Sequence, residues 1–186
     1  MNDLSPGFAS VLDAQACFRA VLSAFSTPGS QISLPVSLTP PSGLSMASAA
    51  LLLTLADAHT KIALPETSAA RHWLTFHTGA PLCDAGAADF CVVTQLPALA
   101  TLRQGTDAAP EDGATLILDV QSLDGARFKL SGPGLKDPVC VALPLDPDFI
   151  VEWQTQTRNA PRGVDIILCA GNQILALPRS LQIEKG

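Results

Sequence analysis

The chain has 186 residues, a formal net charge of -6 at pH 7 and 47% hydrophobic residues. This length allows one domain that buries about two-thirds of its extended-chain surface, so we expect a single domain over residues 1–186 without disulfides or structural metals. The 11 basic residues are scattered along the chain, which excludes the positive surface that a nucleic acid or an anionic membrane would require.

The first half of the chain alternates between helical and extended patterns. The segment 46–56 is apolar almost all round and is capped by Ser45, so we expect a helix that is buried on more than one side. By the same periodicity and turn signals, further helices are predicted at 8–25, 68–76 and 98–103, and strands at 31–36, 61–64 and 89–94.

The second half reads mainly as strands. The runs 115–122 and 127–131, joined around Asp124 and Gly125, predict one hairpin, and a further strand is expected at 139–143. Asp146 resembles the N-cap of a helix that extends to about Arg158. The end of the chain, 182–186, reads as a polar tail.

The segment 161–180 predicts a second, buried hairpin. Its runs 164–170 and 173–177 are separated by Gly171 and Asn172, a pair suited to a tight primed turn. That turn places Cys169 opposite Ile174, Leu168 opposite Leu175 and Ile166 opposite Leu177. Because neither run alternates between apolar and polar residues, both faces should be covered. We therefore predict a three-layer α/β fold, in which a mixed β-sheet carries helices on both faces.

The histidines and cysteines do not predict a metal site. His72 and His77 lie five residues apart, about 140° around a helix, and Cys83 would have to fold back to join them. We expect His72 to be exposed and His77 to anchor the end of its helix. The cysteines are odd in number and lack CxxC spacing, so they are interpreted as buried hydrophobic residues. The N-terminal segment MNDLSPGFAS has neither the basic start nor the apolar run of a signal peptide, which favours a cytoplasmic protein.

Ionic side chains converge at the open end of the closing hairpin. Arg162, Asp165 and Arg179 should lie close together there. One interpretation is an ion pair from Asp165 to either arginine, which holds the strand ends. The other is an anion or phosphate site that uses the bidentate geometry of guanidinium. Arg71 is a further candidate for such a site, but the sequence does not place it.

Several segments resemble, in order and spacing, the H subunit of the bacterial carbon-phosphorus lyase core complex (PhnH). They are VLDAQACFRAVLSAFSTPG, AALLLTLADAHTKIAL, RHWLTFHTGAPL, ADFCVV, GATLILDVQSL, FKLSGPG and RGVDIILCAGNQILALPRS. The resemblance runs from about Phe8 to Leu181. Ser180 and Leu181 depart from the paired threonines that are usual in the family.

The resemblance implies an accessory subunit in phosphonate utilisation. Such a subunit forms a homodimer, acts with the G, I, J and K subunits, and supports formation of ribose 1-phosphonate 5-triphosphate from ATP and a phosphonate. It further implies a reduced form of the fold of pyridoxal-phosphate-dependent transferases, without that cofactor and without any assigned catalytic residue. The alternative is a stand-alone enzyme or binding protein for a phosphorylated small molecule, with its anion site at Arg162, Asp165 and Arg179.

Overall fold

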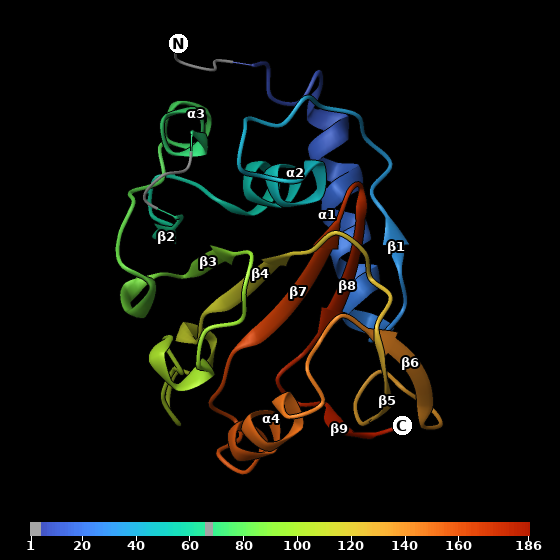
Figure 1. Cartoon of the computed structure of the whole chain (residues 1–186). Helices are drawn as coiled ribbons and strands as arrows, with labels where there is room; N and C mark the ends of the chain where they lie inside the picture. The colour runs from blue at the N-terminus through green and yellow to red at the C-terminus, as the bar shows by residue number, and fades with distance from the viewer. Residues whose placement is uncertain (1–4, 66–68) are drawn as a thin grey trace.

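The computed structural model describes residues 5–65 and 69–186 (Figure 1). Its helices are α1 (Val11–Ser26), α2 (Met46–Leu55), α3 (Ala70–Thr78) and α4 (Phe149–Thr157), with 3-10 turns η1 (Ala85–Ala87), η2 (Leu99–Thr101) and η3 (Pro110–Asp112). Its strands are β1 (Ile32–Ser33), β2 (Ile62–Ala63), β3 (Phe90–Val93), β4 (Thr115–Asp119), β5 (Ala126–Ser131), β6 (Val139–Leu143), β7 (Asp165–Ala170), β8 (Gln173–Leu177) and β9 (Gln182–Lys185).

The main sheet of the described part has the strand order β1-β8-β7-β4-β3-β2. The strands β2, β3, β4 and β7 are parallel, whereas β8 and β1 add in antiparallel pairing. The β7–β8 hairpin has the predicted register, including Leu168 opposite Leu175 and Ile166 opposite Leu177. The prediction of a mixed sheet with a central, buried hairpin is therefore confirmed.

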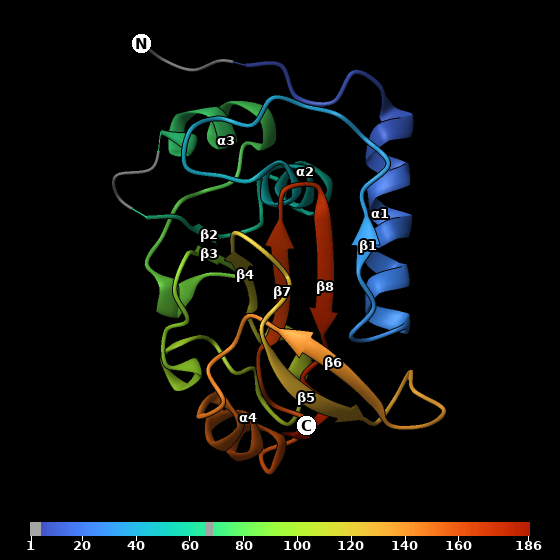
Figure 2. The same ribbon diagram turned by 45° about the vertical axis from the view of Figure 1, so that its right-hand side comes forward.

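Different elements cover the two faces of this sheet. The helices α1, α2 and α3 pack on one face, where Ile117 of β4 and Ile167 of β7 point. On the other face, Leu116 and Ile166 pack against α4 and a small sheet of order β6-β5-β9. Figure 2 shows the small sheet and α4 at the opposite end of the view from α2 and α3. The sequence did not predict that a second sheet would form much of this layer.

The predicted hairpin between 115–122 and 127–131 is wrong. Strand β4 has parallel partners on both sides, β3 and β7, and therefore no free edge for β5. Strand β5 instead pairs with β6 and β9. The burial pattern explains the separation, because β4 is buried on both faces whereas β5 alternates between buried Phe128 and Leu130 and exposed Arg127 and Lys129.

The end of the chain is a strand and not a polar tail. In β9 the side chain of Ile183 is 1% exposed, and it packs in the second core with Leu181. The indole Nε1 of Trp153, on α4, donates a hydrogen bond of 2.9 Å to the carbonyl oxygen of Leu181. A single apolar residue within a short polar segment does not produce the alternation of apolar and polar residues that predicts a strand.

Local hydrogen bonds shift several predicted boundaries. The first helix begins at Val11, after Ser10, whose backbone N–H donates to Asp13 at 2.9 Å. Asp146 accepts from the backbone N–H of Asp148 at 2.9 Å in the turn before α4, so α4 begins later than predicted. The helix predicted at 98–103 is the single turn η2. The helix predicted at 68–76 corresponds to α3, and its predicted start at Ser68 lies outside the described residues.

The helix α2 is buried nearly all round, as predicted, with six successive buried residues from Ala47 to Leu52. Among the described helices, none is both long and apolar enough to cross a membrane. The single domain over residues 1–186 stays a prediction.

Candidate functional site

The structure joins Asp165 and Arg179 at the amino end of β7. The Nε and Nη2 atoms of Arg179 donate to Asp165 Oδ2 at 3.0 and 2.5 Å, and its backbone N–H donates to Oδ1 at 2.7 Å. The Nη1 atom donates to the carbonyl oxygen of Pro110 at 2.6 Å. Each nitrogen of this guanidinium therefore has a partner in the chain.

This ion pair is enclosed, since both side chains are 18% exposed. A Cβ atom at Gly113 would lie 2.3 Å from Arg179 Nη1 and from the carbonyl oxygen of Gly163, so the lack of a side chain there lets the guanidinium approach the backbone. The geometry matches the first interpretation, an ion pair from Asp165 that holds the strand ends. Anion binding by the three predicted residues stays a prediction.

Arg162 does not join this pair. Its Nε lies 3.1 Å from Asp107 Oδ1, and the two side chains are 45% and 77% exposed. The chain turns away at Gly163, whose N–H donates to the carbonyl oxygen of Gln104 at 2.8 Å. Arg162 therefore lies on the surface beside the 104–113 loop, a position that strand register alone did not predict.

A polar cluster that the sequence analysis missed lies at the carboxyl end of β4. Asp119 Oδ1 accepts hydrogen bonds from the hydroxyls of Ser45 and Ser48 at 2.6 and 2.5 Å, and Oδ2 accepts from the N–H of Ser45 at 3.0 Å. The carboxylate thus binds the first turn of α2, where the helix dipole favours negative charge. Burial, and then the charge of Asp119, raise the pKa of the nearby Cys169 thiol. An aspartate that ends an apolar strand was the available signal.

A cavity of about 410 Å³ opens at the carboxyl ends of β2 and β3. Its lining comes from the ends of both strands, from α3 and from the segment before η1. The lining residues are Ala63, Leu64, Pro65, Arg71, Leu82, Cys83, Asp84, Ala85, Cys91, Val92 and Val93. Most of these side chains are apolar, so the cavity suits a ligand with an apolar part.

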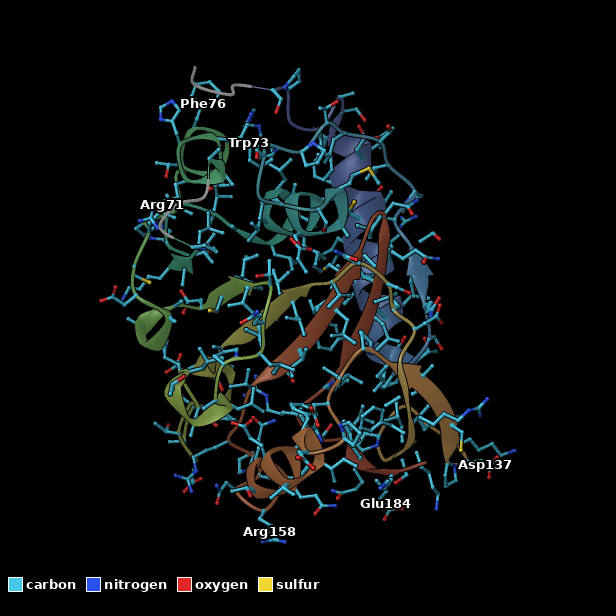
Figure 3. The ribbon with its side chains drawn as sticks, in the orientation of Figure 1. Arg71, Trp73, Phe76, Asp137, Arg158 and Glu184 are labelled. Atoms are coloured by element: carbon cyan, nitrogen blue, oxygen red, sulfur yellow. The ribbon has the colours of Figure 1, made fainter. Side chains whose placement is uncertain are left out.

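Arg71 extends from the first turn of α3, where Figure 3 labels it, and its side chain lines this cavity. Its Nη1 donates to the carbonyl oxygen of Leu64 at 3.1 Å, and no other partner of the guanidinium lies within the described residues. Two cysteines line the same space. Burial raises the pKa of the Cys91 thiol to about 11 and also raises that of Cys83. Both thiols therefore stay neutral near pH 7.

The histidines lie where the sequence indicated. His72 is exposed, and the His77 ring, at the end of α3, lies 3.1 Å from the carbonyl oxygen of Ser5. No group of three or more metal-ligating side chains occurs in the part of the chain that the structure describes. The prediction that the cysteines are buried is confirmed for Cys17, Cys91 and Cys169. It is wrong for Cys140, which is exposed on β6, and Cys83 is only partly buried.

Known proteins resemble this chain over nearly its whole length. The family model described as bacterial phosphonate metabolism protein (PhnH) matches residues 6–184. A Rhizobium meliloti (strain 1021) protein named alpha-D-ribose 1-methylphosphonate 5-triphosphate synthase subunit PhnH is 33% identical over 94% of this chain and 92% of its own length. The putative C-P lyase subunit protein HtxG of Stutzerimonas stutzeri is 30% identical over 91% of this chain and 85% of its own length.

Proposed function

Because this chain belongs to the PhnH family of bacterial phosphonate metabolism proteins, we propose that it is an accessory subunit in phosphonate utilisation. In this role it supports formation of ribose 1-phosphonate 5-triphosphate from ATP and a phosphonate. The similarity to a synthase subunit over 94% of this chain and 92% of that protein's length supports this proposal. The catalytic centre is then carried by a partner chain.

An exposed apolar surface on α1 supports the proposal that the chain assembles with other subunits. Val11, Leu12, Phe18 and Leu22 are 85%, 71%, 46% and 53% exposed. The spacing of Val11, Phe18 and Leu22 places them along one side of the helix. Four large apolar side chains that gather on one helix mark an interaction surface. This group, which we call the α1 surface, is best explained as the contact with another subunit.

The charge of the chain favours a different subunit over a second copy on the α1 surface. Two copies, each of net charge -6, repel each other, whereas a neutral or basic partner does not. The exposed polar residues on this side of the helix are Gln15, Arg19, Ser23 and Ser26, with no carboxylate among them. We assign the surface to one of the G, I, J and K subunits. The homodimer that the family resemblance implies is proposed for another surface.

Co-expression with the G, I, J and K subunits, followed by size-exclusion chromatography, tests the assignment. The wild-type chain should elute with its partners, whereas Phe18→Asp combined with Leu22→Asp should elute alone with an unchanged circular dichroism spectrum. A chain that elutes alone as wild type contradicts the accessory role.

The matched control is Val151→Asp on α4, a residue that is 70% exposed on the opposite part of the molecule. This variant should keep its partners. Light scattering of the isolated chain gives the remaining outcome, because a dimer lost in the α1 double variant would assign the α1 surface to a second copy.

We make three finer proposals. The fold is related to that of pyridoxal-phosphate-dependent transferases, the chain works without that cofactor, and it acts in the cytoplasm. All four lysines, Lys61, Lys129, Lys136 and Lys185, are exposed, whereas a Schiff base with this cofactor uses a lysine held inside its site. An internal-aldimine absorbance band in the purified protein would contradict the cofactor proposal.

A further inference from the structure

The cavity beside Arg71 lies at the carboxyl ends of two parallel strands, the end of an open α/β sheet at which ligands bind. Its walls include Ala63 and Leu64, at the end of β2, and Val92 and Val93, at the end of the parallel strand β3. Ligands of such folds bind outside the carboxyl ends of the parallel strands. A volume of about 410 Å³ falls within the range of roughly 300–1,000 Å³ that is typical of small-molecule sites. Position and size therefore both suit a small ligand.

Arg71 determines the charge of that ligand. Among the described residues that line the cavity it is the one cationic side chain, and within that part of the chain Nη1 is the one guanidinium nitrogen with a partner, the carbonyl oxygen of Leu64. The remaining N–H groups can bind two oxygen atoms of one anion, since guanidinium presents its donors as a planar fork. Arg71 also lies in the first turn of α3, where the helix dipole favours an anion.

The rest of the wall determines that the anion is organic. Leu82, Val92 and Val93 are aliphatic, and the neutral thiols of Cys83 and Cys91 add weakly polar surface. An inorganic ion would leave these side chains in contact with water, whereas a short alkyl group would cover them and gain from the burial of apolar area. The cavity therefore combines one strong donor group with an apolar wall.

We propose that this cavity binds a short-chain organophosphonate, with the phosphonate oxygens on Arg71 and the alkyl group against the aliphatic and thiol side chains. The choice of a phosphonate among organic anions rests on the proposed function. The site is separate from the end of the sheet that holds Arg179, because it lies at the carboxyl ends of the parallel strands and Asp165 begins β7 at the other end.

Isothermal titration of the full chain with ethylphosphonate tests the proposal. Saturable binding is expected, and Arg71→Ala should weaken it at least about tenfold, because a charge-assisted bidentate contact is lost. The matched control is Arg127→Ala, an exposed arginine on β5, which should leave the affinity unchanged. Absence of binding, or equal weakening in both variants, overturns the proposal.

Two further ligands test the chemistry of the site. Inorganic phosphate should bind more weakly than ethylphosphonate because it lacks the alkyl group, and propionate should bind more weakly because its carboxylate carries less charge. Equal affinity for phosphate would show that the apolar wall takes no part. Equal affinity for propionate would overturn the phosphonate assignment.

Cys83 offers a second readout at the cavity. Among the five cysteines, Cys83 and Cys140 are the two that are not buried, so in a Cys140→Ser background a thiol reagent reports on Cys83. Saturating ethylphosphonate should slow this labelling several-fold, and should not slow it when Arg71→Ala is added. Unchanged labelling at saturation would place the ligand elsewhere and overturn the proposal.

The binding and co-elution experiments test the cavity proposal and the accessory role independently. If the chain elutes with its partners but does not bind ethylphosphonate, the cavity proposal fails and the accessory role stands. If ethylphosphonate binds through Arg71 but the chain elutes alone, the accessory role fails and the ligand site stands.

Discussion

The two arginines at opposite ends of the main sheet differ in how fully their guanidinium groups are used. Arg179 donates through Nε, Nη1 and Nη2 to Asp165 and Pro110, and its side chain is 18% exposed. Within the described residues, Arg71 donates through Nη1 alone, to the carbonyl oxygen of Leu64, at the wall of a cavity. The guanidinium nitrogens of Arg179 all donate to partners in the chain, whereas Arg71 keeps N–H groups that can donate to a ligand.

The difference shows that an arginine near a strand end is not by itself an anion site. An enclosed arginine with a carboxylate partner stabilises the strand ends, because removal of either partner leaves the other charge buried without compensation. An arginine with spare donors beside an apolar wall contributes little to folding and has capacity for recognition. The comparison predicts opposite effects on stability and binding when each residue is changed.

The largest expected effect is that of Arg179→Ala on stability. This change leaves Asp165 enclosed without its guanidinium partner and should lower the free energy of unfolding by about 3 kcal/mol. Urea unfolding followed by tryptophan fluorescence measures it. Arg71→Ala and Arg162→Ala are the controls, and each should stay within about 0.5 kcal/mol of wild type, because Arg162 forms an exposed ion pair and the described contact of Arg71 is with a backbone carbonyl and not with a carboxylate. A loss of similar size in all three variants would remove the distinction.

The next effect concerns Asp119, a half-buried carboxylate whose partners in the described part of the chain are two hydroxyls and an N–H, with no cation among them. Asp119→Ala leaves the hydroxyls of Ser45 and Ser48 without their acceptor at the start of α2, and should cost about 2 kcal/mol of unfolding free energy. Asp119→Asn keeps an oxygen acceptor and should lose less. Equal stability of Asp119→Ala and wild type in thermal unfolding would show that the cluster is dispensable.

The smallest effect is expected at Asp84, an exposed carboxylate in the wall of the cavity. Its charge repels an anion on Arg71, but solvent screens the repulsion. Asp84→Asn should therefore tighten ethylphosphonate binding by about twofold at low salt, and the gain should vanish at high salt. Weaker binding in this variant would mean that Asp84 accepts a hydrogen bond from the ligand, and would contradict an anion held by Arg71 alone.

The sequence predicted the elements whose signals are local. The β7–β8 hairpin follows from Gly171 and Asn172 between two apolar runs, and its register is the one derived from that turn. The burial of α2 follows from an apolar sequence on all sides. A tight turn and a continuous apolar run each act over a few residues, so neither depends on distant parts of the chain.

Pairings between segments that are distant in the chain could not be predicted from local sequence patterns. Strand β5 pairs with β6 and β9 and not with β4, because β4 already has two parallel neighbours, β3 and β7. Of these neighbours, β7 begins only at Asp165, far along the chain from β4. Arg162 turns to Asp107, and Arg179 reaches Pro110, because the 104–113 loop passes the amino end of β7. No periodicity within a single segment contains this information.

The sequence by itself thus determined the family, the mixed α/β class and the central hairpin, since turn chemistry and apolar runs specify them locally. Only the tertiary structure decided which arginine is free to bind. Arg71 and Arg179 are the same residue type near strand ends, and their roles differ because distant groups, Pro110 and Asp165 for one and a cavity wall for the other, surround them after folding.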